Sequence, residues 1–140
     1  MNARSSALGR IAAWLPAVLW AGLIFYASSR STVPAPFGIS MLVTSVVGHL
    51  TGYAVLALLF RYALARSSVS RHRASAVAVV LAMLYGLSDE WHQSFVPGRD
   101  ASLFDLAVDL TGAAIGVALF NTIEDRRSRQ ASQHTVIDGQ

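Results

Sequence analysis

The sequence contains no cysteine, and charged residues are scarce. Without cysteine the chain has no disulfide framework and no thiol chemistry. Charged residues make up 14% of the chain, whereas soluble domains average about 25%. The P-loop, the Gly-x-Ser-x-Gly turn and the dinucleotide-binding glycine pattern are also missing. These absences exclude a disulfide-stapled domain and give no support to the common nucleotide-binding or serine-hydrolase sites.

Long uncharged runs dominate the sequence instead. Hydrophobic residues make up 54% of the 140 residues, and no charged side chain occurs in residues 11–29 or 31–60. Each of these runs supplies the roughly 20 residues that a helix needs to cross about 30 Å of hydrocarbon. The runs at 74–88 and 110–123 cover only about 22 Å at 1.5 Å per residue. Their helices must therefore include the polar residues at one end.

We predict an all-α integral membrane protein, a compact bundle of four transmembrane helices formed by residues 1–123. The helices are expected at about 11–27, 41–60, 74–93 and 104–123. Arg61 should extend to the inner interface at the end of the second helix. Residues 124–140 are polar, which predicts a disordered cytoplasmic tail. Cleavage of the first helix as a signal peptide is an alternative, because Arg4 and Arg10 precede it and small residues follow it.

Lysine is absent too, and the 11 arginines are unevenly distributed. Arg30 and Arg99 fall on one side of the predicted bundle, and all the others fall on the opposite side. The positive-inside rule then predicts a multi-pass protein of the bacterial inner (cytoplasmic) membrane with both termini in the cytoplasm. The excess of arginine over acidic residues therefore indicates the orientation of the protein in the membrane and does not indicate a nucleic-acid partner. Membrane lipids are the expected surroundings, and the oligomeric state is left open.

Five of the eight acidic residues lie within residues 89–109: Asp89, Glu90, Asp100, Asp105 and Asp109. Ionisable groups at membrane depth are expensive, so they usually pair with one another and mark a working site. His49, Asp89 and Asp109 should all lie about 6 to 12 Å below the outer ends of their helices. A shared polar site beneath the outer surface is therefore predicted.

Helical spacing also brings polar side chains together. Asp89, His92 and Gln93 share a helix face, as do His49 and Tyr53. Glu90 lies about 100° round the helix from Asp89, and the sequence does not decide which of the two faces the site. On the last helix, Asp105 and Asp109 share a face with Gly112 and Gly116, a small-xxx-small pair that favours close helix packing.

A tight hairpin is predicted between the third and fourth helices. Pro97-Gly98 fits the centre of a type II turn, in which glycine takes the positive φ. Ser102-Leu-Phe-Asp105 has the form of a capping box that starts the last helix. Arg99 would then lie within reach of Asp100, Glu90 or Asp105.

The residue types in this region fit acid–base or binding chemistry. Carboxylates beside a histidine in a poorly hydrated site can divide the roles of proton donor and acceptor, and Arg99 can hold a phosphate or carboxylate with two hydrogen bonds. The candidate catalytic residues are Asp89, Glu90, His92, Arg99, Asp105 and Asp109, and the candidate ligand-binding residues are Gln93, His49 and Tyr53. Alternatively, the charges only neutralise one another and lock the hairpin.

No cofactor is expected. A metal site is conceivable from His49, Asp89, His92 and Asp109, but none is assigned, because the sequence has no compact HExxH or CxxC spacing.

The block Asp89-Glu90-Trp-His92-Gln93-x-Phe95-x-Pro97-Gly98-Arg99, followed by Asp105 and the Gly112/Gly116 pair, resembles the VanZ-like membrane proteins. Ile24-Phe25-x-x-Ser28-Ser29 and His49-x-x-x-Tyr53 are weaker matches, and the resemblance covers roughly residues 11–120. It implies a cell-envelope protein that alters susceptibility to the glycopeptide antibiotic teicoplanin. A lipid-linked cell-wall precursor or the glycopeptide itself would be the partner. Whether the protein is an enzyme on such a precursor, a binding protein or a structural accessory is left open.

Overall fold

The computed structural model describes residues 7–31 and 40–137, and all regular structure within them is helical. The elements are α1 (Ala7–Ala12), α2 (Leu15–Ser28), α3 (Met41–Leu64), α4 (Arg71–Gln93) and α5 (Leu103–Ile137). Four helical stretches are long and apolar enough to cross a membrane: Ala7–Ser28, Met41–Leu64, Arg71–Gln93 and Leu103–Gln133. The predicted all-α architecture of a multi-pass membrane protein is confirmed.

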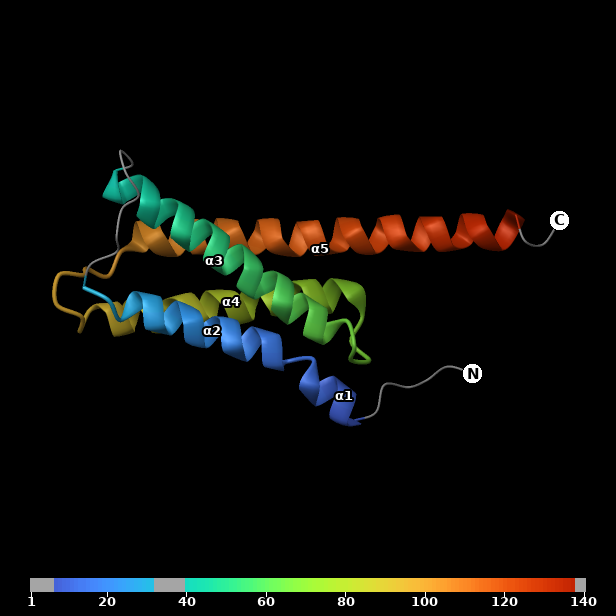
Figure 1. Cartoon of the computed structure of the whole chain (residues 1–140), viewed down its shortest axis with the longest axis horizontal. Coiled ribbons are helices and arrows are strands. Elements are labelled where there is room, and N and C mark those ends of the chain that lie inside the picture. The colour runs from blue at the N-terminus through green and yellow to red at the C-terminus, as the bar shows by residue number, and fades with distance from the viewer. Residues whose placement is uncertain (1–6, 32–39, 138–140) are drawn as a thin grey trace.

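The first span is broken near its start, where the sequence predicted one continuous helix. Pro16 has no backbone N–H, so it cannot donate to the carbonyl of Ala12, and its ring crowds that carbonyl. The backbone N–H of Trp14 bonds instead to the carbonyl of Ile11 at 3.0 Å, a tighter turn than an α-helix makes. α2 then begins at Leu15, with the proline in its first turn. The break separates α1 from α2 (Figure 1).

α3 and α5 pack with their backbones in contact. A Cβ atom added to Gly112 would collide with the carbonyl of Leu50, and one added to Gly116 would collide with the carbonyl of Ala54. Only residues without a side chain allow two helices to approach this closely. The predicted role of this glycine pair is confirmed, and the close approach fixes how Asp109, one turn earlier on α5, faces α3.

Small residues also form the centre of the bundle. The hydrophobic cluster at the centre consists of five alanines with one leucine and one valine: Ala57, Leu64, Ala74, Ala78, Ala82, Ala113 and Val117. Large apolar side chains lie on the outside, among them Leu19, Leu23, Val80 and Leu119, each at least half exposed. Lipid tails are as apolar as leucine, so a membrane protein gains most by packing small residues inside and leaving large ones to the lipid.

α2 is attached to the bundle by two side-chain hydrogen bonds to backbone carbonyls. Trp20 Nε1 donates to the carbonyl of Gly52 on α3 at 2.9 Å. The hydroxyl of Tyr85 on α4 donates to the carbonyl of Ala21 at 2.6 Å. Figure 1 shows α2 lying along α4, with α3 crossing over both α4 and α5.

A polar network joins α3, α4 and α5 at one end of the bundle. The sequence suggested that Arg61 reaches the membrane interface, but the side chain is only 1% exposed. Its Nη2 atom donates to Glu124 Oε2 at 2.7 Å, and Nε lies 3.2 Å from Asn121 Oδ1. The expectation was wrong because α5 brings its own acceptors to the arginine, so the guanidinium need not reach water.

The expected disordered tail is also corrected: α5 continues as helix to Ile137. The first turn beyond residue 123 is held by two ion pairs to neighbouring helices, Arg61 with Glu124 and Arg71 with Asp125. Residues 124–137 contain neither glycine nor proline, so nothing in the local sequence interrupts the helix. Figure 1 shows α5 extending well beyond the other helices. Residues 138–140 lie outside the described part of the chain.

The four spans alternate in direction. The start of α1, the connection between α3 and α4 and the C-terminal part of α5 lie at one end of the bundle (Figure 1). The ends of α2 and α4 and the starts of α3 and α5 lie at the other end, here called the hairpin end after the 94–102 hairpin between α4 and α5. All the candidate site residues lie towards the hairpin end.

Candidate functional site

The hairpin that carries Arg99 has the predicted turn. Gly98 has a φ of +81°, which glycine adopts without strain, and the backbone N–H of Arg99 donates to the carbonyl of Val96 at 3.1 Å. Ser102 Oγ accepts a hydrogen bond from the backbone N–H of Asp105 at 3.3 Å and so caps the start of α5. The turn and the cap together fix where Arg99 and Asp105 stand relative to α4.

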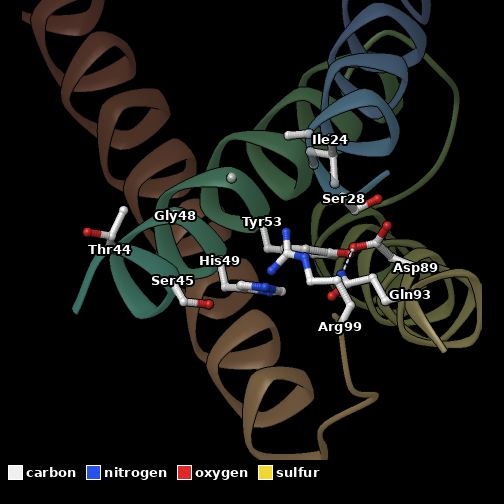
Figure 2. A pocket seen from close by; sticks show the side chains of 12 residues that line it. Ile24, Ser28, Thr44, Ser45, Gly48, His49, Tyr53, Asp89, Gln93 and Arg99 are labelled. Atoms are coloured by element: carbon white, nitrogen blue, oxygen red, sulfur yellow. Dashed lines mark hydrogen bonds between the residues drawn. The ribbon is translucent and has the colours of Figure 1, made fainter. Parts of the chain in front are cut away.

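A pocket with a volume of about 160 Å³ lies between α2, α3 and α4 at the hairpin end. Figure 2 shows it, with side chains converging from the three helices and from the hairpin. Its lining includes five of the predicted site residues: His49, Tyr53, Asp89, Gln93 and Arg99. The remaining lining residues are small or apolar: Ile24, Ala27, Ser28, Thr44, Ser45, Gly48 and Gly52.

The pocket contains buried polar atoms that lack partners. Asp89 Oδ2 accepts a hydrogen bond from Gln93 Nε2 at 2.8 Å. Its second oxygen, Oδ1, and the hydroxyl of Tyr53 are both buried, and neither has a hydrogen-bond partner within the described residues. An unsatisfied buried polar group costs about 1 to 3 kcal/mol. Such a cost is expected where a ligand supplies the missing partner.

Arg99 enters the pocket and does not neutralise the nearby acids. The sequence placed it within reach of Asp100, Glu90 or Asp105, yet among the described residues it forms an ion pair with none of them. Its Nε atom donates to the backbone carbonyl of Arg30 at 3.2 Å. Figure 2 shows the guanidinium directed into the pocket. Arg99 therefore takes no part in the mutual neutralisation that the sequence left as an alternative, because its side chain is held by the Arg30 carbonyl instead.

His49 and Asp109 form a pair across α3 and α5. His49 Nδ1 lies 2.9 Å from Asp109 Oδ1, and the Asp109 side chain is 1% exposed. His49 also stacks on Tyr53, with the two rings within 2° of parallel. The second oxygen of Asp109, Oδ2, is buried without a partner among the described residues. Because Asp109 holds Nδ1, the Nε2 atom of His49 is the ring nitrogen left for other contacts.

The structure decides between Asp89 and Glu90. Asp89 lines the pocket, whereas Glu90 turns towards the start of α5 and accepts a hydrogen bond from the backbone N–H of Ser102 at 2.5 Å. Two further potential metal ligands, His49 and Asp105, lie near Glu90. His49, Glu90 and Asp105 each offer a ligand atom, and these atoms lie within 4.8 Å of one another. Only His49 is shared with the four residues that the sequence suggested for a metal.

His92 lies apart from the other candidates. Its Nε2 atom is 3.0 Å from Ser29 Oγ, and its ring stacks on Phe25 with centroids 4.4 Å apart. Both partners lie at the end of α2, and His92 does not line the pocket. The structure thus assigns His92 a contact that positions α2, away from Asp89 and Gln93.

A family model described as VanZ/LLP1 matches residues 13–124. The chain belongs to the VanZ/LLP1 family. No curated protein and no solved structure matches the chain. The family match includes every residue of the pocket and of the His49–Glu90–Asp105 group. The resemblance inferred from the Asp89–Arg99 block is therefore confirmed.

In this VanZ/LLP1 protein the pocket combines one cation with several neutral or acidic acceptors. The Arg99 guanidinium suits a phosphate or carboxylate oxygen. The free Asp89 Oδ1 suits a hydroxyl or amine donor, and the Tyr53 hydroxyl can serve either role. The arrangement can therefore bind a small polar group that carries a negative charge and at least one hydrogen-bond donor.

Sequence reasoning missed the pocket-lining residues of α2 and of early α3. Gly48 and Gly52 are four residues apart on one face of α3, next to His49, and both line the pocket. Nothing lies within 4 Å of a Cβ atom placed on Gly48. The spacing of Gly48 and Gly52 is the same as that of Gly112 and Gly116, which pack closely against α3, so the sequence alone gave no signal of a pocket here.

Proposed function

We propose that this VanZ/LLP1 protein binds the anionic group of a cell-envelope ligand in the pocket at the hairpin end. Through that ligand the protein would alter susceptibility to glycopeptide antibiotics such as teicoplanin. The ligand class is a lipid-linked cell-wall precursor or a related envelope molecule presented at the outer leaflet. The observation that carries the proposal is the Arg99 guanidinium, which enters the pocket without an acidic partner among the described residues.

The electrostatics of the site support this proposal. A guanidinium at the mouth of an apolar membrane pocket attracts an anion strongly, because little water screens the charge there. The Nε contact to the Arg30 carbonyl orients the planar group, which leaves its terminal nitrogens for two parallel hydrogen bonds. The cavity volume of about 160 Å³ suits a headgroup fragment and excludes a whole glycopeptide.

The location of the pocket fits an envelope ligand. Arg30 and Arg99 follow α2 and α4 at the hairpin end, whereas Arg61, Arg66, Arg71 and Arg73 lie at the end of α3, in the α3–α4 connection or at the start of α4, at the opposite end of the bundle. The positive-inside rule places the hairpin end outside the cytoplasmic membrane of a bacterium. The pocket would then open to the leaflet in which lipid-linked cell-wall precursors are used.

The test is a susceptibility assay with matched variants. The full chain is expressed in a teicoplanin-sensitive bacterium as wild type, Arg99→Ala, Tyr53→Phe and Arg66→Ala, and the membrane level of each protein is measured by immunoblot. Arg66 provides a matched control because it is an exposed arginine at the opposite end of the bundle. We expect the wild type and Arg66→Ala to shift the inhibitory concentration of teicoplanin equally.

Arg99→Ala should lose the shift at an unchanged membrane level, and Tyr53→Phe should reduce it. If protection instead follows protein abundance across all variants, the polar residues only stabilise the bundle and the binding proposal is wrong. If the wild type gives no shift, the glycopeptide part of the proposal fails.

A further inference from the structure

We infer that His49, Glu90 and Asp105 form a binding site for one divalent transition-metal ion, with Zn²⁺ as the best match. The site uses one residue from each of α3, α4 and α5, and their ligand atoms lie within 4.8 Å of one another. One imidazole and two carboxylates are a ligand set that zinc accepts, with a further position left open. This inference goes beyond anion binding in the pocket and does not depend on it.

The orphaned oxygen of Glu90 is the first observation that points to a ligand. The Glu90 side chain is buried, with the residue only 7% exposed, and Oε1 has no hydrogen-bond partner among the described residues. Oε2 is already bonded to the backbone N–H of Ser102 at 2.5 Å. The hydrogen bond to Oε2 fixes the carboxylate, and Oε1 remains a buried acceptor that a metal ion could use as a ligand. A cation between Glu90, His49 and Asp105 would satisfy it.

The contact between His49 and Asp109 is the second, independent observation. Histidines that bind metals almost always give their other ring nitrogen to a carboxylate or carbonyl, which fixes the tautomer and the ring orientation. Here Asp109 Oδ1 lies 2.9 Å from His49 Nδ1. Nε2 is therefore left as the nitrogen that would bind the ion. The Tyr53 ring lies parallel to the imidazole, with the ring centroids 6.3 Å apart.

The spacing of the ligand atoms is wider than in an occupied zinc site. Bonds of about 2.0 to 2.2 Å place tetrahedral ligands about 3.4 Å apart, whereas these atoms lie within 4.8 Å of one another. Closing the site needs side-chain movements of about 1 Å. Asp105 is partly exposed, so its side chain is free to make most of this adjustment.

The experiment measures metal retention by the purified full chain in detergent. The protein is stripped with a chelator, loaded with Zn²⁺, dialysed and analysed for zinc by mass spectrometry, and Co²⁺ serves as a spectroscopic probe of the ligand field. Variants are Glu90→Gln, Asp105→Asn, His49→Gln and Asp109→Asn. Asp100→Asn is the control, since Asp100 is an exposed carboxylate of the same hairpin and lies outside both the group and the pocket lining. Circular dichroism verifies that each variant is folded.

We expect about one zinc per chain for the wild type and for Asp100→Asn, and at least a tenfold loss of affinity for Asp105→Asn and His49→Gln. Asp109→Asn should weaken binding about tenfold, because it removes the charge behind His49. If Glu90→Gln unfolds, Asp105→Asn still tests the metal site, because the Asp105 side chain forms no hydrogen bond or ion pair within the described residues whose loss could unfold the protein. A wild type that retains no zinc, or an Asp100→Asn variant that loses as much as Asp105→Asn, would overturn the inference.

Discussion

Asp109 holds His49 across 60 residues of sequence, with Oδ1 2.9 Å from Nδ1 and the carboxylate almost fully buried. The pair joins α3 to α5 beside the pocket. It is possible only because Gly112 lets the two backbones approach closely. The same stretch of α5 thus provides both the close helix packing at Gly112 and the polar contact of Asp109 with His49.

Removal of the Asp109 side chain should destabilise the bundle more than its neutralisation. Asp109→Ala leaves His49 Nδ1 without a buried acceptor and should lower the free energy of unfolding by about 2 kcal/mol. Asp109→Asn keeps an oxygen acceptor and should cost about 1 kcal/mol or less. Unfolding of the purified protein in mixed detergent micelles would measure both. Equal losses would mean that His49 does not depend on this contact.

Gly116→Ala should weaken the packing of α3 against α5. The added methyl group would meet the carbonyl of Ala54, and such overpacking typically costs about 1 to 3 kcal/mol. Gly22→Ala is the matched control, because nothing lies within 4 Å of a Cβ atom at Gly22. That change should be neutral or slightly stabilising, since alanine favours helix. Thermal unfolding followed by circular dichroism compares the two, and similar melting temperatures would contradict the packing argument.

Glu90→Ala should loosen the start of α5. The substitution removes the acceptor of the Ser102 backbone N–H, so hydrogen exchange of that amide should accelerate at least tenfold. Asp100→Ala changes an exposed carboxylate in the same hairpin and should leave the exchange rate unchanged. Mass spectrometry of peptides from the 94–106 region reads this out. Protection of Ser102 that survives in Glu90→Ala would show that the contact is dispensable.

Arg61→Met should destabilise the end of the bundle opposite the hairpin. It removes the buried donor to Asn121 and Glu124, and we expect a loss of about 2 kcal/mol, because Glu124 is partly exposed and can be hydrated. Arg66→Met, at an exposed site, should cost under about 0.5 kcal/mol. The same micelle unfolding assay applies, and a small effect at Arg61 would show that the network adds little stability.

The absence of native cysteine makes the orientation directly measurable. Single cysteines at Asp100 and Ser68 would place one thiol in the hairpin and the other in the α3–α4 connection, and both positions are exposed. A maleimide that cannot cross the membrane should label Asp100→Cys in intact cells. It should label Ser68→Cys only after permeabilisation. The reverse pattern would put the pocket on the cytoplasmic side and remove the basis for an outer-leaflet ligand.

The sequence predicted the helices and the hairpin well because each has a local signal. Uncharged runs define the spans, and Pro97-Gly98 defines the turn that Gly98 confirms with its positive φ. The partners of long side chains were less predictable. Arg61 and Arg99 each have many possible acceptors along a flexible stem, and only the arrangement of α3, α5 and the hairpin selects Asn121 and Glu124 for one and a backbone carbonyl for the other.

The sequence predicted which residues lie near the candidate site, but it did not predict which of them line the pocket and which lie apart from it. Helical spacing grouped His92 with Asp89, yet a helix face is broad, and the arrival of α2 drew His92 towards Phe25 and Ser29. The same spacing could not separate the surroundings of Asp89 and Glu90, which depend on where α5 begins. Whether these residues bind a ligand or perform chemistry stays a prediction.

α5 belongs to both polar regions of the molecule. Asp105 and Asp109 stand at its hairpin end, and Asn121, Glu124 and Asp125 meet the arginines of α3 and α4 about 18 Å further along. A helix keeps its rise of about 1.5 Å per residue, so it cannot shorten between them. A displacement of Asp109 along the axis of α5 would therefore also displace Glu124, so the two polar networks share one rigid element.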